Sequence, residues 1–184
     1  MRRMSYIALL LLPAMLAAGK DTVRQAAEPM APVPAAVRSA DLVQGKVNAK
    51  AKVFYLLLAS CQDEVCREYG AGLGKIYREM KGKEAELILL SKDAPSHALK
   101  WAKNCGLRCP ILPAGKRSDK LPFPYTGEHL PPMLVALDAE GRKLAEANAE
   151  RIILLLHDWK KLVHDIEREK ERKDLPWTDL EIDE

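Results

Sequence analysis

Residues 53–66 read VFYLLLASCQDEVC: a continuous apolar run, a polar turn and two cysteines. The apolar run begins with β-branched and aromatic residues, which favours a buried strand. Ser60 can then form a turn or a cap, and Asp63 and Glu64 place negative charge where a helix N-terminus prefers it. The stretch therefore predicts a buried strand that passes through Cys61 into a helix.

The residues after this turn carry a helical pattern. Apolar side chains recur at steps of three or four, as on one face of a helix that ends near Gly82. They are Val65, Tyr69, Leu73, Ile76 and Met80. Gly70, Gly72 and Gly74 weaken such a helix intrinsically. We interpret these glycines as positions that permit a close backbone approach or a kink.

A second strand and helix follow. ELILL at residues 86–90 is predicted to be a buried strand, and a helix is expected over about residues 97–104. Asp93 or Ser96 can cap this helix. The next segment, 105–128, is rich in proline and long for a structureless loop, which indicates that it is functional or pinned.

The last part of the domain is predicted to be a hairpin and a helix. MLVAL at residues 133–137 is a third strand, the turn DAEG follows, and residues 142–147 form a less apolar edge strand. Asn148 is expected to cap the last helix. A helix between two strands forces a parallel crossover, whereas the tight turn makes the last two strands antiparallel. The sequence thus predicts an α/β fold with a mixed four- to five-stranded sheet and helices on both faces.

The two ends of the chain differ from this middle part. Residues 1–19 have a basic start, a short apolar run and small residues, which is typical of a cleavable signal peptide; an uncleaved anchor is the alternative. Residues 20–40 are predicted to be a Pro/Ala-rich linker, 41–174 the domain and 175–184 an acidic tail. The expected location is the periplasm or the outside of the cell, with no membrane span after cleavage.

The charge balance indicates neither nucleic acid nor an anionic membrane as a partner. The chain has 29 Lys and Arg against 26 Asp and Glu, and loss of the two arginines in the signal peptide leaves 27 against 26. A nearly neutral domain lacks the basic surface that such partners require.

The four cysteines form two close pairs, Cys61 with Cys66 and Cys105 with Cys109. An even number of cysteines in an exported chain favours disulfides, although four cysteines allow three connectivities and the sequence does not choose between them. A zinc site is an alternative, but the spacings fit it loosely and close pairs in an exported chain favour disulfides. No metal is therefore expected.

The order of elements and three local patterns resemble the thioredoxin superfamily. The first strand runs into Ala59-Ser60-Cys61, with the helix just after the cysteine. The segment PPMLVALD at 131–138 resembles the one in which thioredoxins carry a cis-proline before their third core strand. DAEGRKL at 138–144 resembles the family's turn into the edge strand. The long Pro-rich loop is most similar to the nucleoredoxin and tryparedoxin branch. The resemblance implies a thioredoxin-like three-layer fold.

The resemblance also implies an activity: thiol–disulfide exchange on protein or peptide disulfides, without a cofactor. Cys61 would attack, Cys66 would resolve the mixed disulfide, and Pro131 and Pro132 would bind the substrate peptide by strand addition. Active members carry Trp-Cys-x-x-Cys, whereas here four residues separate the cysteines and Glu64 stands where the resolving cysteine would be. The alternative is a redox-inactive domain with structural disulfides that binds a partner protein beside Pro132.

The chemistry of the first pair depends on where the helix begins. A cysteine at a helix N-terminus has a lowered pKa, while Asp63 and Glu64 oppose a thiolate there. If both cysteines were helical, the five-residue step would place them about 140° apart. Cys66 can therefore resolve only if Cys61 lies outside the helix. For Cys105 and Cys109 we expect a structural disulfide.

Overall fold

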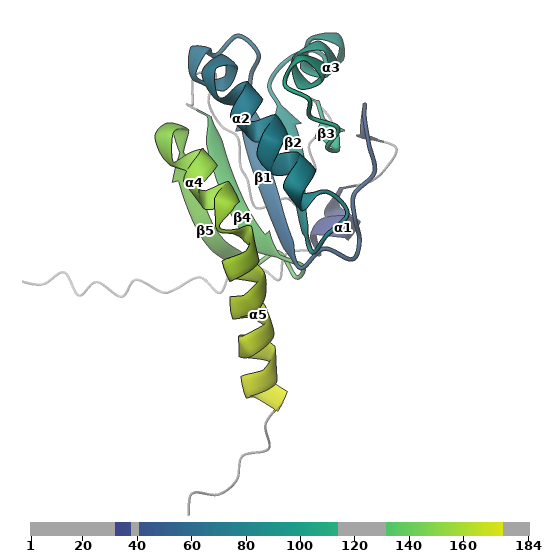
Figure 1. Ribbon diagram of the computed structural model, residues 1–184. Helices are drawn as coiled ribbons and strands as arrows, with labels where there is room; N and C mark the ends of the chain where they lie inside the picture. The colour runs from purple at the N-terminus through teal and green to yellow at the C-terminus, as the bar shows by residue number, and fades with distance from the viewer. Residues whose placement is uncertain (1–31, 38–40, 114–131, 175–184) are drawn as a thin grey trace, which may run out of the picture.

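The predicted strand at 53–58 lies at the centre of a five-stranded sheet (Figure 1). The computed structural model describes residues 32–37, 41–113 and 132–174. The strands are β1 (Val53–Ala59), β2 (Ala85–Ser91), β3 (Ile111–Leu112), β4 (Met133–Asp138) and β5 (Lys143–Asn148). Their order is β3-β2-β1-β4-β5, with parallel pairs on the β2 side of β1 and antiparallel pairs on the β4 side. The predicted mixed α/β sheet is confirmed.

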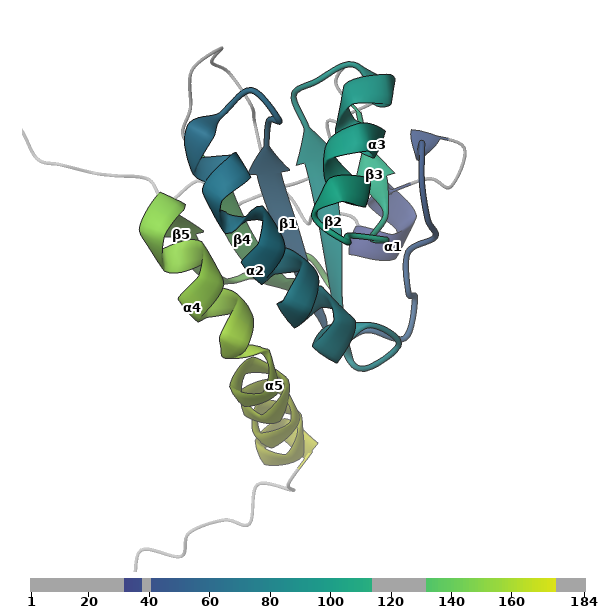
Figure 2. The ribbon, with the colours of Figure 1, turned by 45° about the horizontal axis from the view of Figure 1, so that its top comes forward.

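Four of the helices cover one face of this sheet (Figure 2). They are α2 (Glu64–Met80), α3 (Pro95–Asn104), α4 (Ile152–His157) and α5 (Trp159–Asp174). The short helix α1 (Val33–Ala36) packs on the other face. Within the described residues, helices therefore lie on both faces, but very unequally.

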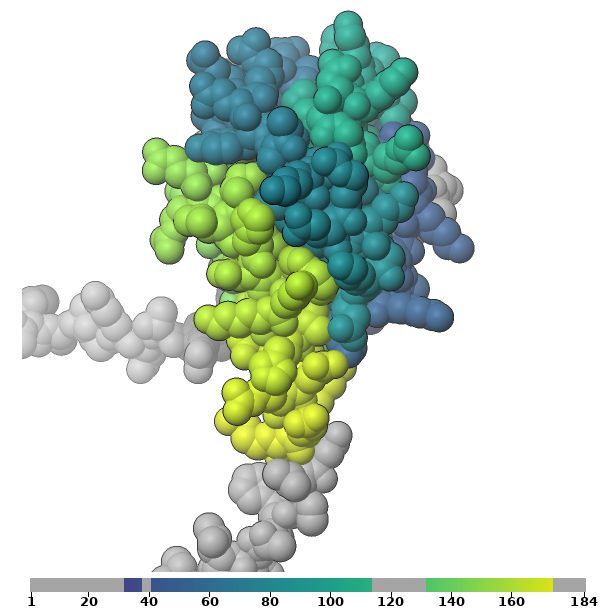
Figure 3. Space-filling view, viewed as in Figure 1, coloured from purple at the N-terminus to yellow at the C-terminus, as the bar shows by residue number. Residues whose placement is uncertain are grey.

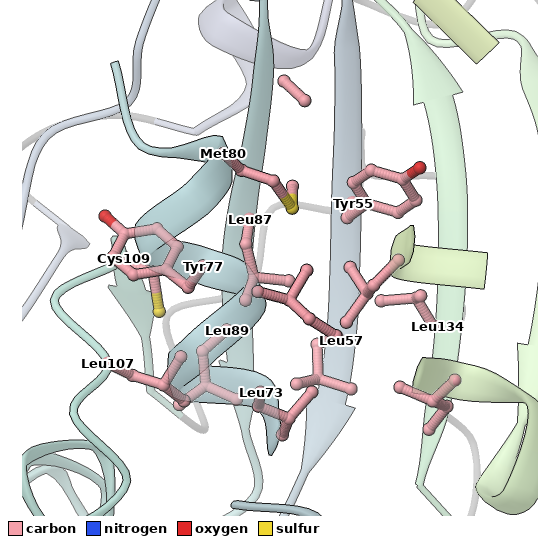
Figure 4. Packing of buried hydrophobic residues seen from close by; sticks show 14 of the residues in the cluster. Tyr55, Leu57, Leu73, Tyr77, Met80, Leu87, Leu89, Leu107, Cys109 and Leu134 are labelled. Carbon is pink, nitrogen blue, oxygen red and sulfur yellow. The ribbon is translucent and has the colours of Figure 1, made fainter. Parts of the chain in front are cut away.

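The side-chain alternation of β1 produces two separate cores. Tyr55 and Leu57 face α2, whereas Phe54 and Leu56 face α1, and all four are buried. Figure 4 shows side chains of α2 lying over those of β1 and β2 on the first face. Each fully buried side chain of this kind contributes roughly 1.5–3 kcal/mol. Burial on both faces explains why β1 reads as a continuous apolar run.

Part of the predicted linker 20–40 is helical. Pro32 precedes α1 and Pro34 lies in its first turn, where proline fits a helix. Val33 and Val37 are buried against the second core, and the backbone N–H of Val33 donates to the carbonyl of Ala139 at 3.2 Å. Residues 32–37 are therefore packed on the domain and are not an extended spacer. The predicted signal peptide (1–19) and acidic tail (175–184) lie outside the described residues.

The last helix differs from the prediction at its start. Asn148 is followed by a 3-10 turn, Ala149–Arg151, and its side chain makes no capping hydrogen bond. Asn148 therefore stands at the N-cap position of this turn, but its side chain does not cap it as predicted. The helix is also divided at Asp158 into α4 and α5. Among the described residues, no helix is long and apolar enough to cross a membrane.

Both edges of the sheet carry further interactions. Gln44 forms an antiparallel bridge with Ile111 of β3, and its side-chain amide donates to the carbonyls of Leu107 and Cys109 at 3.3 and 3.1 Å. On the other edge, Lys143 and Glu146 of β5 form an exposed ion pair at 2.9 Å.

Candidate functional site

Cys61 lies in the turn that joins β1 to α2. The helix begins at Glu64, and its N-cap is Asp63, whose side chain accepts a hydrogen bond from the backbone of Val65 at 2.9 Å. The predicted acidic helix start is confirmed. Cys61 itself precedes the cap by two residues, so it is outside the helix, while Cys66 is inside its first turn. This arrangement meets the condition for Cys66 to face Cys61.

Asp93 is the site residue that the sequence did not reveal. Its carboxylate accepts hydrogen bonds from the Ser60 hydroxyl and from the Cys61 backbone N–H, both at 2.7 Å. The predicted role of Asp93 as a cap of α3 is wrong, because that helix starts at Pro95 with Ala94 as N-cap and no side-chain cap. The carboxylate is instead used to hold the Cys61 turn.

The pairing of β1 with β2 explains this contact. Ala59 is aligned with Ser91 in the parallel register, so the residues just after both strands meet at the same edge of the sheet. Lys92 also donates its backbone N–H to the carbonyl of Ala59 at 3.1 Å. A polar residue after each of two neighbouring parallel strands was the available sequence signal.

The surroundings of Cys61 favour its thiol form. Burial raises the pKa of the Cys61 thiol, and the hydrogen bond and negative charge of Asp93 raise the pKa further. Arg67 acts in the opposite direction. The pKa of Cys61 is therefore not lowered, although a lowering is expected for a cysteine at a helix N-terminus. The carboxylate that opposes its thiolate is that of Asp93.

Cys66 lies beneath the same turn. It is 3% exposed, and burial raises the pKa of its thiol to about 11. A hydrogen bond from the Ser60 backbone lowers this pKa in part, which places the Cys66 sulfur against the turn that carries Cys61. The structure thus brings the two predicted catalytic cysteines to one turn, one partly exposed and one buried.

A groove of about 570 Å³ opens beside Cys61, between α2 and α3 (Figure 3). It is lined by Cys61, Gln62, Arg67, Ala71, His97, Lys100, Trp101, Asn104 and Cys105. Among the described residues that line it are the cationic side chains of Arg67 and Lys100 and no carboxylate. An acidic or neutral peptide fits this lining better than a basic one.

Pro132 lies at the same end of the sheet as Cys61. Met133 is paired with Leu58, so Pro132, one residue before β4, lies beside the end of β1 that leads to the cysteine turn. It is buried, and its carbonyl accepts from the Ala149 backbone at 3.0 Å. Pro131 lies outside the described residues, and so does the peptide bond between the two prolines. Substrate binding by Pro131 and Pro132 stays a prediction.

Cys105 and Cys109 occupy different surroundings. All four cysteines are thiols in this structure. Cys109 is fully buried beside Tyr77 (Figure 4), whereas Cys105 is partly exposed in the groove. Their predicted disulfide stays a prediction. Among the described residues, no group of three or more His, Cys, Asp or Glu side chains could hold a metal ion.

Alkylation of Cys61 is expected to be slow at pH 7 and to accelerate with rising pH beyond about 8.5, the ordinary pKa of a cysteine. The reason is that the thiolate reacts, and a raised pKa moves thiolate formation to higher pH. Iodoacetamide labelling of a Cys66→Ser variant, followed by mass spectrometry, measures this rate. A plateau reached below pH 8 would contradict the raised pKa.

Comparison with solved structures places the fold. A thiol:disulfide interchange protein of the thioredoxin family from Chlorobium tepidum TLS is similar with a TM-score of 0.55 and 15% identity, over 72% of this chain and 94% of that chain. StoA from Bacillus subtilis has a TM-score of 0.48 and 15% identity, over 60% and 84%. A thiol:disulfide interchange protein from Bacteroides sp. has a TM-score of 0.49 and 20% identity, over 63% of this chain and 76% of that chain.

No family model and no curated protein matches the sequence. The assignment therefore depends on three-dimensional similarity. The strand order, the helices over β1 and the likeness to the Chlorobium structure agree with the fold that the sequence implied. The chain has the fold of the thioredoxin-like superfamily.

Proposed function

We propose that this chain is an exported thiol–disulfide oxidoreductase that acts on protein or peptide disulfides. The observation that carries the proposal is the Ser60–Cys66 turn: it presents a partly exposed Cys61 at the mouth of a groove, with the Cys66 sulfur beneath the same turn. The Chlorobium protein of the same fold is described as a thiol:disulfide interchange protein, which agrees with this proposal.

The reaction consists of two exchanges. The Cys61 thiolate attacks one sulfur of a substrate disulfide, forms a mixed disulfide and releases the other substrate sulfur as a thiolate. The Cys66 thiolate then attacks the Cys61 sulfur, and the second substrate thiol leaves. The substrate gains two electrons and the protein ends with a Cys61–Cys66 disulfide. Pro131 and Pro132 would hold the substrate backbone beside Cys61.

The surroundings of Cys61 favour the reducing direction. An oxidant of this kind has a strongly stabilised thiolate, which makes its disulfide easy to reduce. Here Asp93 and burial destabilise the Cys61 thiolate, so the dithiol form gives up electrons more readily. We infer that the protein donates electrons to its substrate.

Replacement of Cys61 is the direct test. Cys61→Ser is expected to reduce the rate of insulin disulfide reduction to the uncatalysed level, because no other partly exposed sulfur lies on this turn. Cys109→Ala is the matched control, since Cys109 is fully buried away from the turn and its loss leaves the turn intact. Equal rates for Cys61→Ser and the unmodified protein would contradict the proposal.

The second candidate is a redox-inactive domain that binds a partner protein beside Pro132. The raised pKa values of Cys61 and Cys66 favour it, because neither thiol is activated at neutral pH. The reduction potential of the Cys61–Cys66 pair separates the two. A value of roughly −120 to −270 mV supports exchange, whereas a value below about −300 mV supports a structural disulfide.

A further inference from the structure

The buried face of α2 carries a strip of three small residues at four-residue steps: Cys66, Gly70 and Gly74. Cys105 lies along this strip. A Cβ atom at Gly70 would stand 2.4 Å from the Cys105 sulfur, and one at Gly74 would stand 1.8 Å from the Cys105 carbonyl oxygen. The residue is therefore oriented with its carbonyl toward Gly74 and its sulfur toward Gly70, in the direction of Cys66.

Cys66 is the next position of the strip, one helical turn from Gly70. Residues four apart on a helix have Cβ atoms about 5–6 Å apart, so the Cys105 sulfur lies within roughly one turn of Cys66. A disulfide requires Cβ atoms about 3.5–4.5 Å apart. Cys105 directly follows the last residue of α3 and precedes Gly106, whose φ of 72° marks a chain turn. A bond between Cys66 and Cys105 therefore requires this turn to move toward Cys66.

Cys109 is a less suitable partner for Cys66 than Cys105. It is completely buried, and the Gln44 side-chain amide donates a hydrogen bond to its carbonyl. Cys105, in contrast, is partly exposed in the groove that also contains Cys61. An oxidant or a thiol that reaches Cys61 through the groove therefore also reaches Cys105.

We propose that Cys66 has two alternative disulfide partners, Cys61 and Cys105. This inference deepens the proposed function and rests on it for the exchange step. The Cys105 thiolate attacks the Cys66 sulfur of the Cys61–Cys66 disulfide. A Cys66–Cys105 bond forms, the Cys61–Cys66 bond breaks, and Cys61 leaves as a thiolate that takes up the proton released from Cys105. No net oxidation occurs, and the partly exposed Cys61 regains its free thiol.

Trypsin separates the sulfurs that must be distinguished. Cleavage after lysine and arginine leaves Cys61 and Cys66 on peptide 53–67, Cys105 on peptide 104–108, and Cys109 on the next peptide. A Cys61→Ser variant is oxidised with oxidised glutathione, alkylated and digested. We expect peptide 53–67 linked to peptide 104–108 as the main disulfide species.

Two double variants provide the controls. The linked peptides are expected to vanish when Cys105→Ser is added to Cys61→Ser, and to persist when Cys109→Ala is added instead. Circular dichroism of each variant confirms that it is folded. A bond between Cys105 and Cys109, or alkylation of both Cys66 and Cys105 after oxidation, would overturn the inference.

The unmodified protein tests the exchange step. After brief oxidation to the Cys61–Cys66 form, we expect peptide 53–67 to become linked to peptide 104–108 while Cys61 becomes alkylatable. A Cys61–Cys66 disulfide that stays unchanged over hours overturns the exchange. If the linked peptides form but insulin reduction is absent, the proposed function fails and the pairing stands. If insulin is reduced but Cys105 stays alkylatable throughout, the pairing fails and the proposed function stands.

Discussion

Gly74→Ala is expected to lower the free energy of unfolding by about 3 kcal/mol, at the upper end of what overpacking costs. The new methyl group would stand 1.8 Å from the carbonyl oxygen of Cys105 and 3.0 Å from its carbonyl carbon. Both are backbone atoms, so a rotamer change cannot relieve the overlap and α2 must move away from the end of α3. Alanine gains about 1 kcal/mol in helix propensity over glycine, which does not offset this displacement. Urea unfolding followed by circular dichroism measures the change.

Gly72→Ala is the matched control for that experiment. It makes the same chemical change in the same helix, but its methyl group would meet only the Ile153 side chain, at 3.4 Å. This is an ordinary contact, so the propensity gain of about 1 kcal/mol is expected to appear as unchanged or increased stability. Equal stabilities for Gly74→Ala and Gly72→Ala would show that α2 does not approach Cys105 as described.

Asp93→Asn is expected to lower the pKa of Cys61 and to increase its alkylation rate at neutral pH. The substitution removes the negative charge that faces the thiol but keeps an oxygen to accept from the Cys61 backbone. Each unit by which the pKa falls raises the thiolate population about tenfold while the thiol form predominates. The measurement is the pH profile of iodoacetamide labelling in a Cys66→Ser background.

Asp63→Asn serves as the control for Asp93→Asn. Asp63 is also close to the turn, but it caps α2, and asparagine is an equally good cap. The larger effect on Cys61 is therefore expected from Asp93, because its carboxylate is hydrogen-bonded to the cysteine. If Asp63→Asn shifts the pH profile of Cys61 alkylation more than Asp93→Asn does, the carboxylate that opposes the Cys61 thiolate is the one at the helix start and not Asp93.

The sequence predicted those parts of the fold that depend on local patterns. The apolar run at 53–58 gave the central strand, the steps of three and four from Val65 to Met80 gave α2, and the glycines between them marked a close approach. These features follow from which side chains are buried, and burial leaves a period in the sequence.

The parts that the sequence did not predict depend on residues far apart in the chain. Asp93 reaches Cys61 across 32 residues, through a strand register that local patterns do not specify. A polar residue before Pro95 has the same appearance whether it caps α3 or bonds elsewhere, so the cap was assigned wrongly. Similarly, the sequence does not show that the Cys105 sulfur lies against Gly70, 35 residues earlier, and the predicted Cys105–Cys109 disulfide stays a prediction. Sequence proximity is a weak guide to partners when helices pack side by side.

The interactions at both edges of the sheet, at β3 and at β5, are expected to limit aggregation at high protein concentration. A strand with free backbone groups is a template on which a second chain can add, and such addition begins aggregation. Gln44 and Val43 occupy the backbone of Ile111 on one side, and the charges of Lys143 and Glu146 discourage a partner strand on the other. These contacts leave both described edge strands poorly suited to adding a strand from another chain.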